Sequence, residues 1–347
     1  MRKLVIRGTF HSAGVQIGAQ TASYLPFVRD KTVDLLQENY GAGSIERIRE
    51  LADRYLASTQ EIFPQALEYM AGLALGSRMP FKDIALISFS EEISGEAAEK
   101  CSTLAVPTDK GWLIGHNEDY EPQYFGKMFA LDLKISGYPR VFSLNYPGHF
   151  PCLAGSLNEC GVAITNNALW PAAVPGVSKN VTHFRAALAL GMTEAIDFLS
   201  MQPAALTGHY TVAGAAGNIL YGLEVSNEKT AKKNMILHQT DGKPYWHTNH
   251  VRFLELYEPD PALAAGNHTF VRAQKLERLI ADDHLPSKSY EMLDLLSTND
   301  GVLHRTPAQN PTSVTLASVA IRPKTGELWI RDADPATAER DLYLHFE

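Results

Sequence analysis

Cysteine is scarce in this chain: its 347 residues include three, Cys101, Cys152 and Cys160. A small secreted scaffold held together by disulfides would be rich in cysteine, so this set predicts reduced thiols in an intracellular protein. A run of Lys and Arg is also missing, and the formal net charge is −8. Because neutralising phosphates needs a basic surface, this charge argues against nucleic acid as the main partner.

Long apolar runs are absent as well. The start of the chain offers only Leu4, Val5 and Ile6 between charged residues, too few for the apolar core of a signal peptide. No later stretch reaches the roughly 20 apolar residues of a membrane-spanning helix. The sequence therefore predicts a cytoplasmic protein with no membrane partner, long enough to bury a core without a disulfide or a structural metal.

The spacing of apolar residues divides the chain at Cys101. Before it, helical spacing over 27–55, interrupted at 41–43, and a further segment after Pro64 predict a mostly helical region. After it, short β-type runs between turn sequences predict an antiparallel meander, followed by groups of helices and strands. Segregated helices and strands indicate an α+β fold, with antiparallel sheets covered by helices, in one domain over 1–347. The expected strands are 102–106, 112–115, 129–135, 141–146, 161–165, 210–213, 219–225, 234–239, 314–322 and 327–330, and the later helices are 184–190, 193–199, 270–282 and 288–296.

Three polar clusters are candidates for chemistry. Cys101 comes where an acidic segment meets the first strand, so its thiol can lie open at the end of a sheet, although a cysteine is more often a small core residue. Residues 115–120 follow the next strand. Their spacing is equally consistent with a cluster of polar groups beside the thiol and with a solvated turn. In the cluster at 246–250, His247 and His250 lack the carboxylate of an H-E-x-x-H motif, which disfavours a metal site.

The order of these clusters resembles the penicillin acyltransferase (isopenicillin N acyltransferase) family of N-terminal nucleophile (Ntn) hydrolases. A helical region of 100 residues comes first, then Lys-Cys-Ser-Thr at 100–103 opens a strand, Gly-His-Asn-Glu-Asp at 115–119 follows it, and His-Thr-Asn-His stands at 247–250. The ordered set is more specific than any one motif. Further similarities are spread along the chain: Gly8 to His11, Gly14, Gly18, Glu68 to Ala74, Asn158 to Ala163, Asn166, Asn167, Arg185 and Leu316 to Val319.

The resemblance implies a four-layer αββα sandwich, made as an inactive precursor that cuts its own chain at the Lys100–Cys101 bond. The products would be an α fragment, 1–100, and a β fragment, 101–347. A thiol with a pKa near about 8.5 needs a nearby base to become a thiolate. An α-amino group, with a pKa of about 7.7 to 8.0, is suitable, but Cys101 has one only after cleavage. Cleavage would therefore create the base beside the nucleophile.

The resemblance also implies roles for single residues. Cys101 would attack an amide or thioester carbonyl and form an acyl-enzyme, with its own amine moving the protons. Asn249 would donate its side-chain amide to the oxyanion, and Asp119 would orient the amine or serve the self-cleavage step. The substrate-contacting residues expected from the sequence are Asn117, His116, Arg185 and His247. The expected partner is a small amide or acyl substrate, with no metal and no organic cofactor.

The sequence departs from the family pattern at residues of the expected substrate pocket and at the expected cleavage site. His116 and Glu118 stand where the family often has Gln and Trp, and Lys100 stands where the founding members have Gly. A papain-like hydrolase with His247, His250 or His116 as its base is one alternative, disfavoured because a papain-type nucleophile opens a helix rather than a strand. A non-catalytic small-molecule binding protein on the same fold is another. The sequence leaves open whether the protein hydrolyses its substrate or transfers the acyl group to an amine. It also leaves open whether the protein forms a homo-oligomer.

Overall fold

The computed structural model describes residues 1–95, 101–169, 174–216, 218–260, 267–298, 301–310, 312–334 and 340–347. Eight strands form the first sheet. Adjacent strands in it run antiparallel, except β1 and β4, which run parallel to each other. In spatial order they are β1 (Arg2–Gly8), β4 (Phe129–Ile135), β5 (Arg140–Asn145), β6 (Ser156–Asn158), β7 (Ala163–Ala168), β8 (Gly208–Ala213), β9 (Leu220–Val225) and β10 (Met235–Gln239).

The second sheet is antiparallel throughout and contains the strand that Cys101 precedes. Every residue of its strand β12 is buried, as expected for a strand packed on both faces. In spatial order the strands are β11 (Tyr245–His247), β2 (Ser102–Thr108), β3 (Gly111–Tyr120), β12 (Val314–Arg322), β13 (Glu327–Asp332) and β14 (Asp341–His345).

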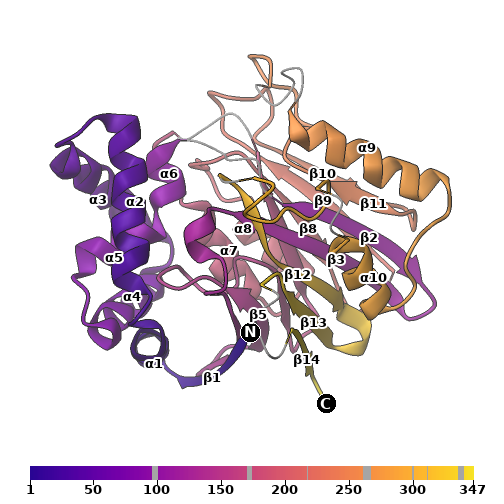
Figure 1. The fold of residues 1–347 in the computed structure, drawn as a ribbon, viewed down its shortest axis with the longest axis horizontal. Coiled ribbons are helices and arrows are strands. Elements are labelled where there is room, and N and C mark those ends of the chain that lie inside the picture. The colour runs from indigo at the N-terminus through magenta and orange to yellow at the C-terminus, as the bar shows by residue number, and fades with distance from the viewer. Residues whose placement is uncertain are drawn as a thin grey trace.

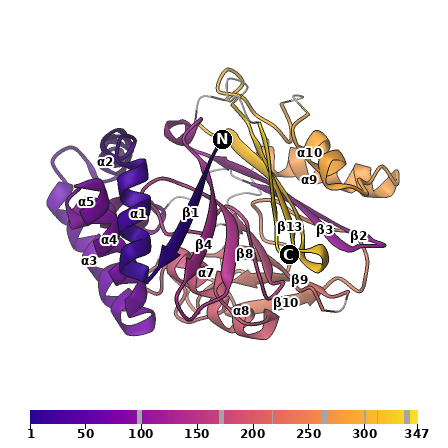
Figure 2. The ribbon, with the colours of Figure 1, turned by 90° about the horizontal axis from the view of Figure 1, so that it is seen from below.

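Helices cover the outer face of each sheet. On the first sheet, α7 (Lys179–Ala187) and α8 (Met192–Leu199) share an apolar cluster with β7, β8 and β9. On the second, α9 (His268–Ala281) and α10 (Ser289–Leu296) share one with β2, β3 and β12. Figure 2 shows the resulting order of layers, helix, sheet, sheet, helix. The predicted α+β class and αββα sandwich are confirmed.

The remaining helices form a bundle beside the sandwich (Figure 1). Two of them, α1 and α4, pack closely through glycines. A Cβ added at Gly14 would lie 2.1 Å from the Tyr69 carbonyl oxygen, and one at Gly72 would lie 2.0 Å from that of His11. Because backbone cannot move aside as a flexible side chain can, these positions require glycine. The bundle helices are α1 (Phe10–Thr21), α2 (Leu25–Tyr40), α3 (Ile45–Ile62), α4 (Pro64–Ser77), α5 (Phe81–Ser88) and α6 (Ser90–Ser94).

The expected elements match the observed ones closely, with three kinds of difference. The sequence prediction missed the strands β1, β6, β11 and β14 and the helix α1, and it treated the acidic segment that contains the short helix α6 as loop. It also ended the second strand of the second sheet at residue 115, whereas β3 continues to Tyr120. The interpretation of 115–120 as a solvated turn was wrong, because 115–120 are buried. Within the described residues, no helix combines the length and the apolar character needed to cross a membrane.

Candidate active site

Cys101 lies directly before β2, at the wall of a small cavity. Its side chain is buried, and its thiol donates a weak hydrogen bond to the Asp119 carbonyl oxygen at 3.8 Å. The backbone of Cys101 has φ +52°, a left-handed conformation that non-glycine residues rarely adopt. Strained backbone of this kind is concentrated at functional sites. Lys100, the residue on the other side of the expected cut, lies outside the described residues.

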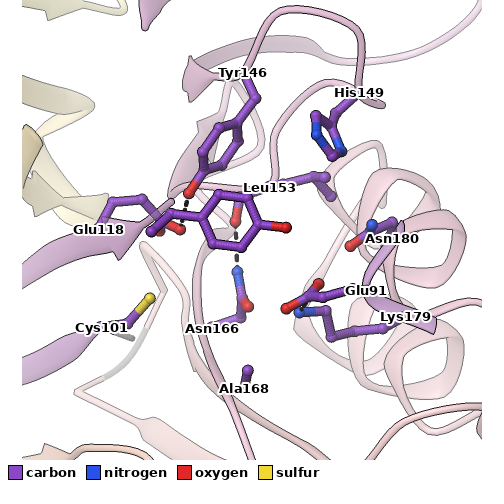
Figure 3. Close-up of a pocket in the computed structure, with 11 residues that line it drawn as sticks. Glu91, Cys101, Glu118, Tyr146, His149, Leu153, Asn166, Ala168, Lys179 and Asn180 are labelled. Carbon is purple, nitrogen blue, oxygen red and sulfur yellow. Dashed lines mark hydrogen bonds and ion pairs between the residues drawn. The ribbon is translucent and has the colours of Figure 1, made fainter. Parts of the chain in front are cut away.

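The cavity beside the thiol is small and polar. It has about 30 Å³ of space accessible to water and lies between the two sheets, α6 and the start of α7 (Figure 3). Glu118 accepts a hydrogen bond from the Tyr146 hydroxyl at one end, and at the other Lys179 forms an ion pair of 2.7 Å with Glu91. The lining residues are Glu91, Cys101, Glu118, Tyr120, Tyr146, His149, Leu153, Asn166, Ala168, Lys179 and Asn180.

The pairing of β2 with β3 decides which side chains face the cavity. Thr103 lies opposite His116, and the Thr103 hydroxyl reaches Asn167 on the first sheet at 3.0 Å, so this face of β2 and β3 points between the sheets. Side chains alternate along a strand. Glu118 therefore shares the inner face with His116, and their Oε2 and Nε2 atoms are 3.0 Å apart.

The opposite face of β3 carries Asn117 and Asp119. The Asn117 amide donates to the carbonyl oxygens of Leu296 and Leu303 at 2.9 and 2.7 Å, and its oxygen accepts from Ser318. These bonds tie α10 and the following segment to the sheet. Asn117 is not among the cavity residues, so its geometry does not support the predicted contact with substrate.

Asp119 is a fully buried carboxylate held by arginine. The Arg305 guanidinium donates to Asp119 Oδ2 at 2.9 Å, and both side chains are almost completely enclosed. Burial alone would raise the pKa of Asp119, but the charges of Arg305 and Arg272 lower it below its ordinary value. Oδ1 makes no hydrogen bond within the described part of the chain. Asp119 is thus an anion fixed behind the nucleophile strand.

A second buried arginine connects Cys101 with Asn249. Arg272, on α9, donates to the Cys101 carbonyl oxygen and, at 2.8 Å, to the Asn249 side-chain oxygen. This contact orients the Asn249 amide, whose nitrogen donates to the Ala168 carbonyl oxygen at the cavity wall, at 2.8 Å. The sequence prediction missed Arg272 and Arg305. In the sequence, Arg272 is one residue of an ordinary amphipathic helix and Arg305 is one residue of a loop. Neither belongs to a recognisable local motif.

Glu224 fixes the loop that carries Asn249. Its carboxylate accepts hydrogen bonds from the backbone N–H groups of 252–254, between 2.7 and 3.0 Å, and Oε1 lies 3.0 Å from His247 Nε2. The Nδ1 atom of His247 lies 2.7 Å from the Thr248 carbonyl oxygen. His247 is completely buried in these contacts and does not line the cavity, so the structure gives it a positioning role rather than the predicted contact with substrate.

Arg185 also lies away from the cavity. Its guanidinium stacks over the Phe198 ring, 4.1 Å from the centroid, and is 3.6 Å from Glu194. This geometry fits an ion pair with Glu194 better than the predicted contact with substrate. The other two cysteines differ from Cys101: burial raises the pKa of the Cys152 thiol to about 12, and Cys160 is exposed in a turn.

An αββα sandwich with a cysteine at the start of a central strand is the architecture of the Ntn hydrolases. Residues 106–337 match the family model described as acyl-coenzyme A:6-aminopenicillanic acid acyl-transferase. The chain belongs to this family, which confirms the resemblance drawn from the sequence. The matched region begins just after Cys101 and contains Asp119 and Asn249.

One curated relative is the β-alanyl-dopamine/carcinine hydrolase of Drosophila melanogaster, 24% identical over 185 residues. The chain spans about half of that relative's length, and the match covers 48% of each protein. Among solved structures, a Caenorhabditis elegans N-acylethanolamine-hydrolyzing acid amidase ortholog has 15% identity and a TM-score of 0.45, covering 71% of this chain and 100% of that one. A mutant conjugated bile acid hydrolase from Clostridium perfringens has 13% identity and a TM-score of 0.46, covering 71% and 92%. Scores this low establish neither a shared activity nor a shared substrate.

Proposed function

We propose that this protein is an amide hydrolase or acyltransferase whose nucleophile is the thiol of Cys101, released as an N-terminal residue by self-cleavage of the Lys100–Cys101 bond. The observation that carries the proposal is the position of Cys101: its thiol lines a polar cavity in a member of an acyltransferase family. The left-handed backbone at Cys101 adds support, because relief of local strain favours cutting the chain there.

In the proposed reaction the α-amine of Cys101 takes the thiol proton, and the thiolate attacks the substrate carbonyl carbon. The C–N bond breaks, the amine leaving group receives the proton, and the acyl group stays on sulfur until water or an acceptor amine removes it. Asn249 stabilises the oxyanion with its side-chain amide nitrogen, which also donates to the Ala168 carbonyl oxygen. Asp119 holds the new ammonium group by charge attraction.

The proposed substrate is an amide with a short, polar acyl group. A cavity lined by carboxylate, ammonium and amide groups does not suit a long apolar chain. The curated relative is named for the hydrolysis of β-alanyl-dopamine and carcinine, and a β-alanyl group is a short, polar acyl group, which supports the same choice. The first substrates to test are therefore β-alanyl amides, with N-acyl amino acids and acyl thioesters for comparison.

Activity and acyl-enzyme formation test the proposal. We expect the wild-type protein and the Cys160→Ser control, which removes an exposed thiol, to release product from at least one of these amides. Cys101→Ala should lose at least about 10³-fold in rate, and Asn249→Ala about 10²- to 10³-fold. The mass of the acyl group should be found on the fragment that begins at Cys101. Full activity in Cys101→Ala would contradict the proposal, and binding without turnover would favour the non-catalytic alternative.

One observation favours a second candidate, a cysteine hydrolase with a histidine base. His116 is the histidine whose ring nitrogen lies within 4.8 Å of the Cys101 thiol, whereas His247 is engaged with Glu224. In this reaction His116 takes the thiol proton, and no cut is needed. Whether the active protein has been cut distinguishes the two candidates. An active protein that remains one chain supports the histidine base.

A further inference from the structure

Three different metal-binding side chains meet at the nucleophile. The thiol sulfur of Cys101, a ring nitrogen of His116 and a carboxylate oxygen of Glu118 all lie within 4.8 Å of one another, and the three residues are buried. They come from paired strands, since Cys101 precedes β2 and the other two project from the inner face of β3. In the described ranges this is the one group of three or more such side chains with atoms close enough to share an ion.

Neighbouring side chains orient two of these donors. The Thr103 hydroxyl has one hydrogen, which it donates to Asn167 Oδ1 at 3.0 Å, so His116 Nδ1 donates in the 2.8 Å bond to Thr103. The 3.0 Å contact between Nε2 and Glu118 Oε2 holds one proton between the two atoms, and a metal ion bound at Nε2 displaces it. Glu118 is in turn held through Oε1 by the Tyr146 hydroxyl (Figure 3). Its other oxygen, Oε2, lies 3.0 Å from His116 Nε2. Hydrogen bonds of this kind fix the ligands in established metal sites.

The donor set suits Zn²⁺. Zinc binds one sulfur, one nitrogen and one oxygen at about 2.3, 2.0 to 2.1 and 2.0 to 2.2 Å, so a tetrahedral ion holds its ligands about 3.3 to 3.6 Å apart. The Nε2 to Oε2 distance of 3.0 Å, with all three atoms within 4.8 Å, requires only small side-chain shifts. Cys101 and Glu118 both line the cavity, which leaves the fourth position open to water and provides the route of entry.

We propose that Cys101, His116 and Glu118 form a binding site for Zn²⁺ and that zinc binding reversibly blocks the nucleophile. The blocking effect rests on the proposed function, because it requires Cys101 to be the attacking group. Binding displaces two protons to solvent, one from the thiol and one shared between His116 and Glu118, and the two anionic ligands balance the charge of the ion. Nothing is oxidised or reduced. Zinc affinity should therefore rise with pH.

Direct metal binding to the full-length protein, as purified and freed of metal, tests the site. Co²⁺ is the spectroscopic probe, because a cobalt–thiolate bond absorbs in the near ultraviolet, and Zn²⁺ affinity follows from competition with a zinc indicator dye. The variants are Cys101→Ser, His116→Gln and Glu118→Gln. Cys160→Ser, which removes an exposed thiol, is the matched control. Circular dichroism and urea unfolding check that each variant is folded.

We expect one ion per protein molecule, with the thiolate absorption present in the wild type and the control and lost in Cys101→Ser. His116→Gln and Glu118→Gln should each weaken Zn²⁺ binding at least about tenfold, since loss of an outer partner alone costs 10- to 100-fold in known sites. Binding that stays within about threefold in both of these variants, or that disappears in Cys160→Ser, would overturn the site. So would absence of binding by the wild type at micromolar zinc.

The cobalt absorption is measured without substrate, so this experiment can refute the metal site without refuting the proposed function, and the activity assay can refute the function without refuting the site. A protein that binds Zn²⁺ at these residues and hydrolyses no amide retains the site and refutes the proposed function. An active amidase whose rate is unchanged by saturating Zn²⁺ retains the function and refutes the block. Restoration of full activity by a chelator is the expected behaviour of the wild type.

Discussion

Replacing Glu224 by Gln tests whether one buried carboxylate holds the loop that carries Asn249. Glu224 has no exposed surface, and it accepts hydrogen bonds from three successive N–H groups, 252–254. A Gln side chain presents an NH₂ group to some of these donors and leaves them without an acceptor. Removing one partner of a buried charged network costs about 3 to 5 kcal/mol. We expect a loss of this size in the free energy of unfolding.

Glu255→Gln is the matched control. Glu255 pairs with Lys232 at the surface, where both side chains are more than half exposed, and such a pair contributes about 0 to 1 kcal/mol. Urea unfolding followed by circular dichroism at pH 7 measures both variants. A Glu224→Gln protein within 1 kcal/mol of the control would refute the assigned role of this carboxylate.

The pH dependence gives a second check on Glu224. Burial alone would raise its pKa, but the hydrogen bond with His247 and those from the backbone lower it below its ordinary value of 4.5. A carboxyl group with a lowered pKa in the folded state stabilises the fold above its unfolded pKa and loses this effect as the pH falls through the folded value. The difference between wild type and Glu224→Gln should be full at pH 7 and should narrow below about pH 4.5. A difference that does not change between pH 7 and pH 3.5 would contradict this reasoning.

Two further substitutions probe other parts of the structure. Asp119→Asn removes the negative charge 2.9 Å from the buried Arg305 guanidinium, so we expect a loss of about 3 to 5 kcal/mol in urea unfolding; a loss under 1 kcal/mol would rule out the ion pair as a structural element. Gly72→Ala places a methyl group against helix α1 backbone, and we expect about 1 to 3 kcal/mol of destabilisation despite the better helix propensity of alanine. Gly191→Ala, where a Cβ meets nothing within 4 Å, should change the unfolding free energy by less than about 1 kcal/mol, and equal effects of the two changes would refute the close packing of α1 and α4.

The elements that could be predicted from the sequence are those with a local signal. Periodic apolar residues located most helices and strands to within a few residues, and the change of pattern at Cys101 located the start of the second sheet. The segment Arg2–Gly8 was harder, because only three apolar residues lie between charges, and its strand exists through parallel pairing with β4, whose residues are 127 positions away in the chain.

The site was only partly predictable for the same reason. Motifs pointed to Cys101, Asp119 and Asn249. The alternation of side chains along β3 decides which neighbouring residues face the cavity, so that Glu118 lines it and Asn117 does not. The distance between strands cannot be obtained from a local pattern. Arg272, Arg305 and Tyr146 reach the site from elements far away in the chain, so only the tertiary structure identifies them.

The mass of the purified chain tests the central claim most directly. If Cys101 becomes an N-terminal nucleophile, denaturing gels and intact mass should show two fragments, 1–100 and 101–347, and the sequence of the second should begin Cys-Ser-Thr. Cys101→Ala should remain one chain and be inactive. A wild-type protein that hydrolyses amides while it remains a single chain of 347 residues would contradict the account.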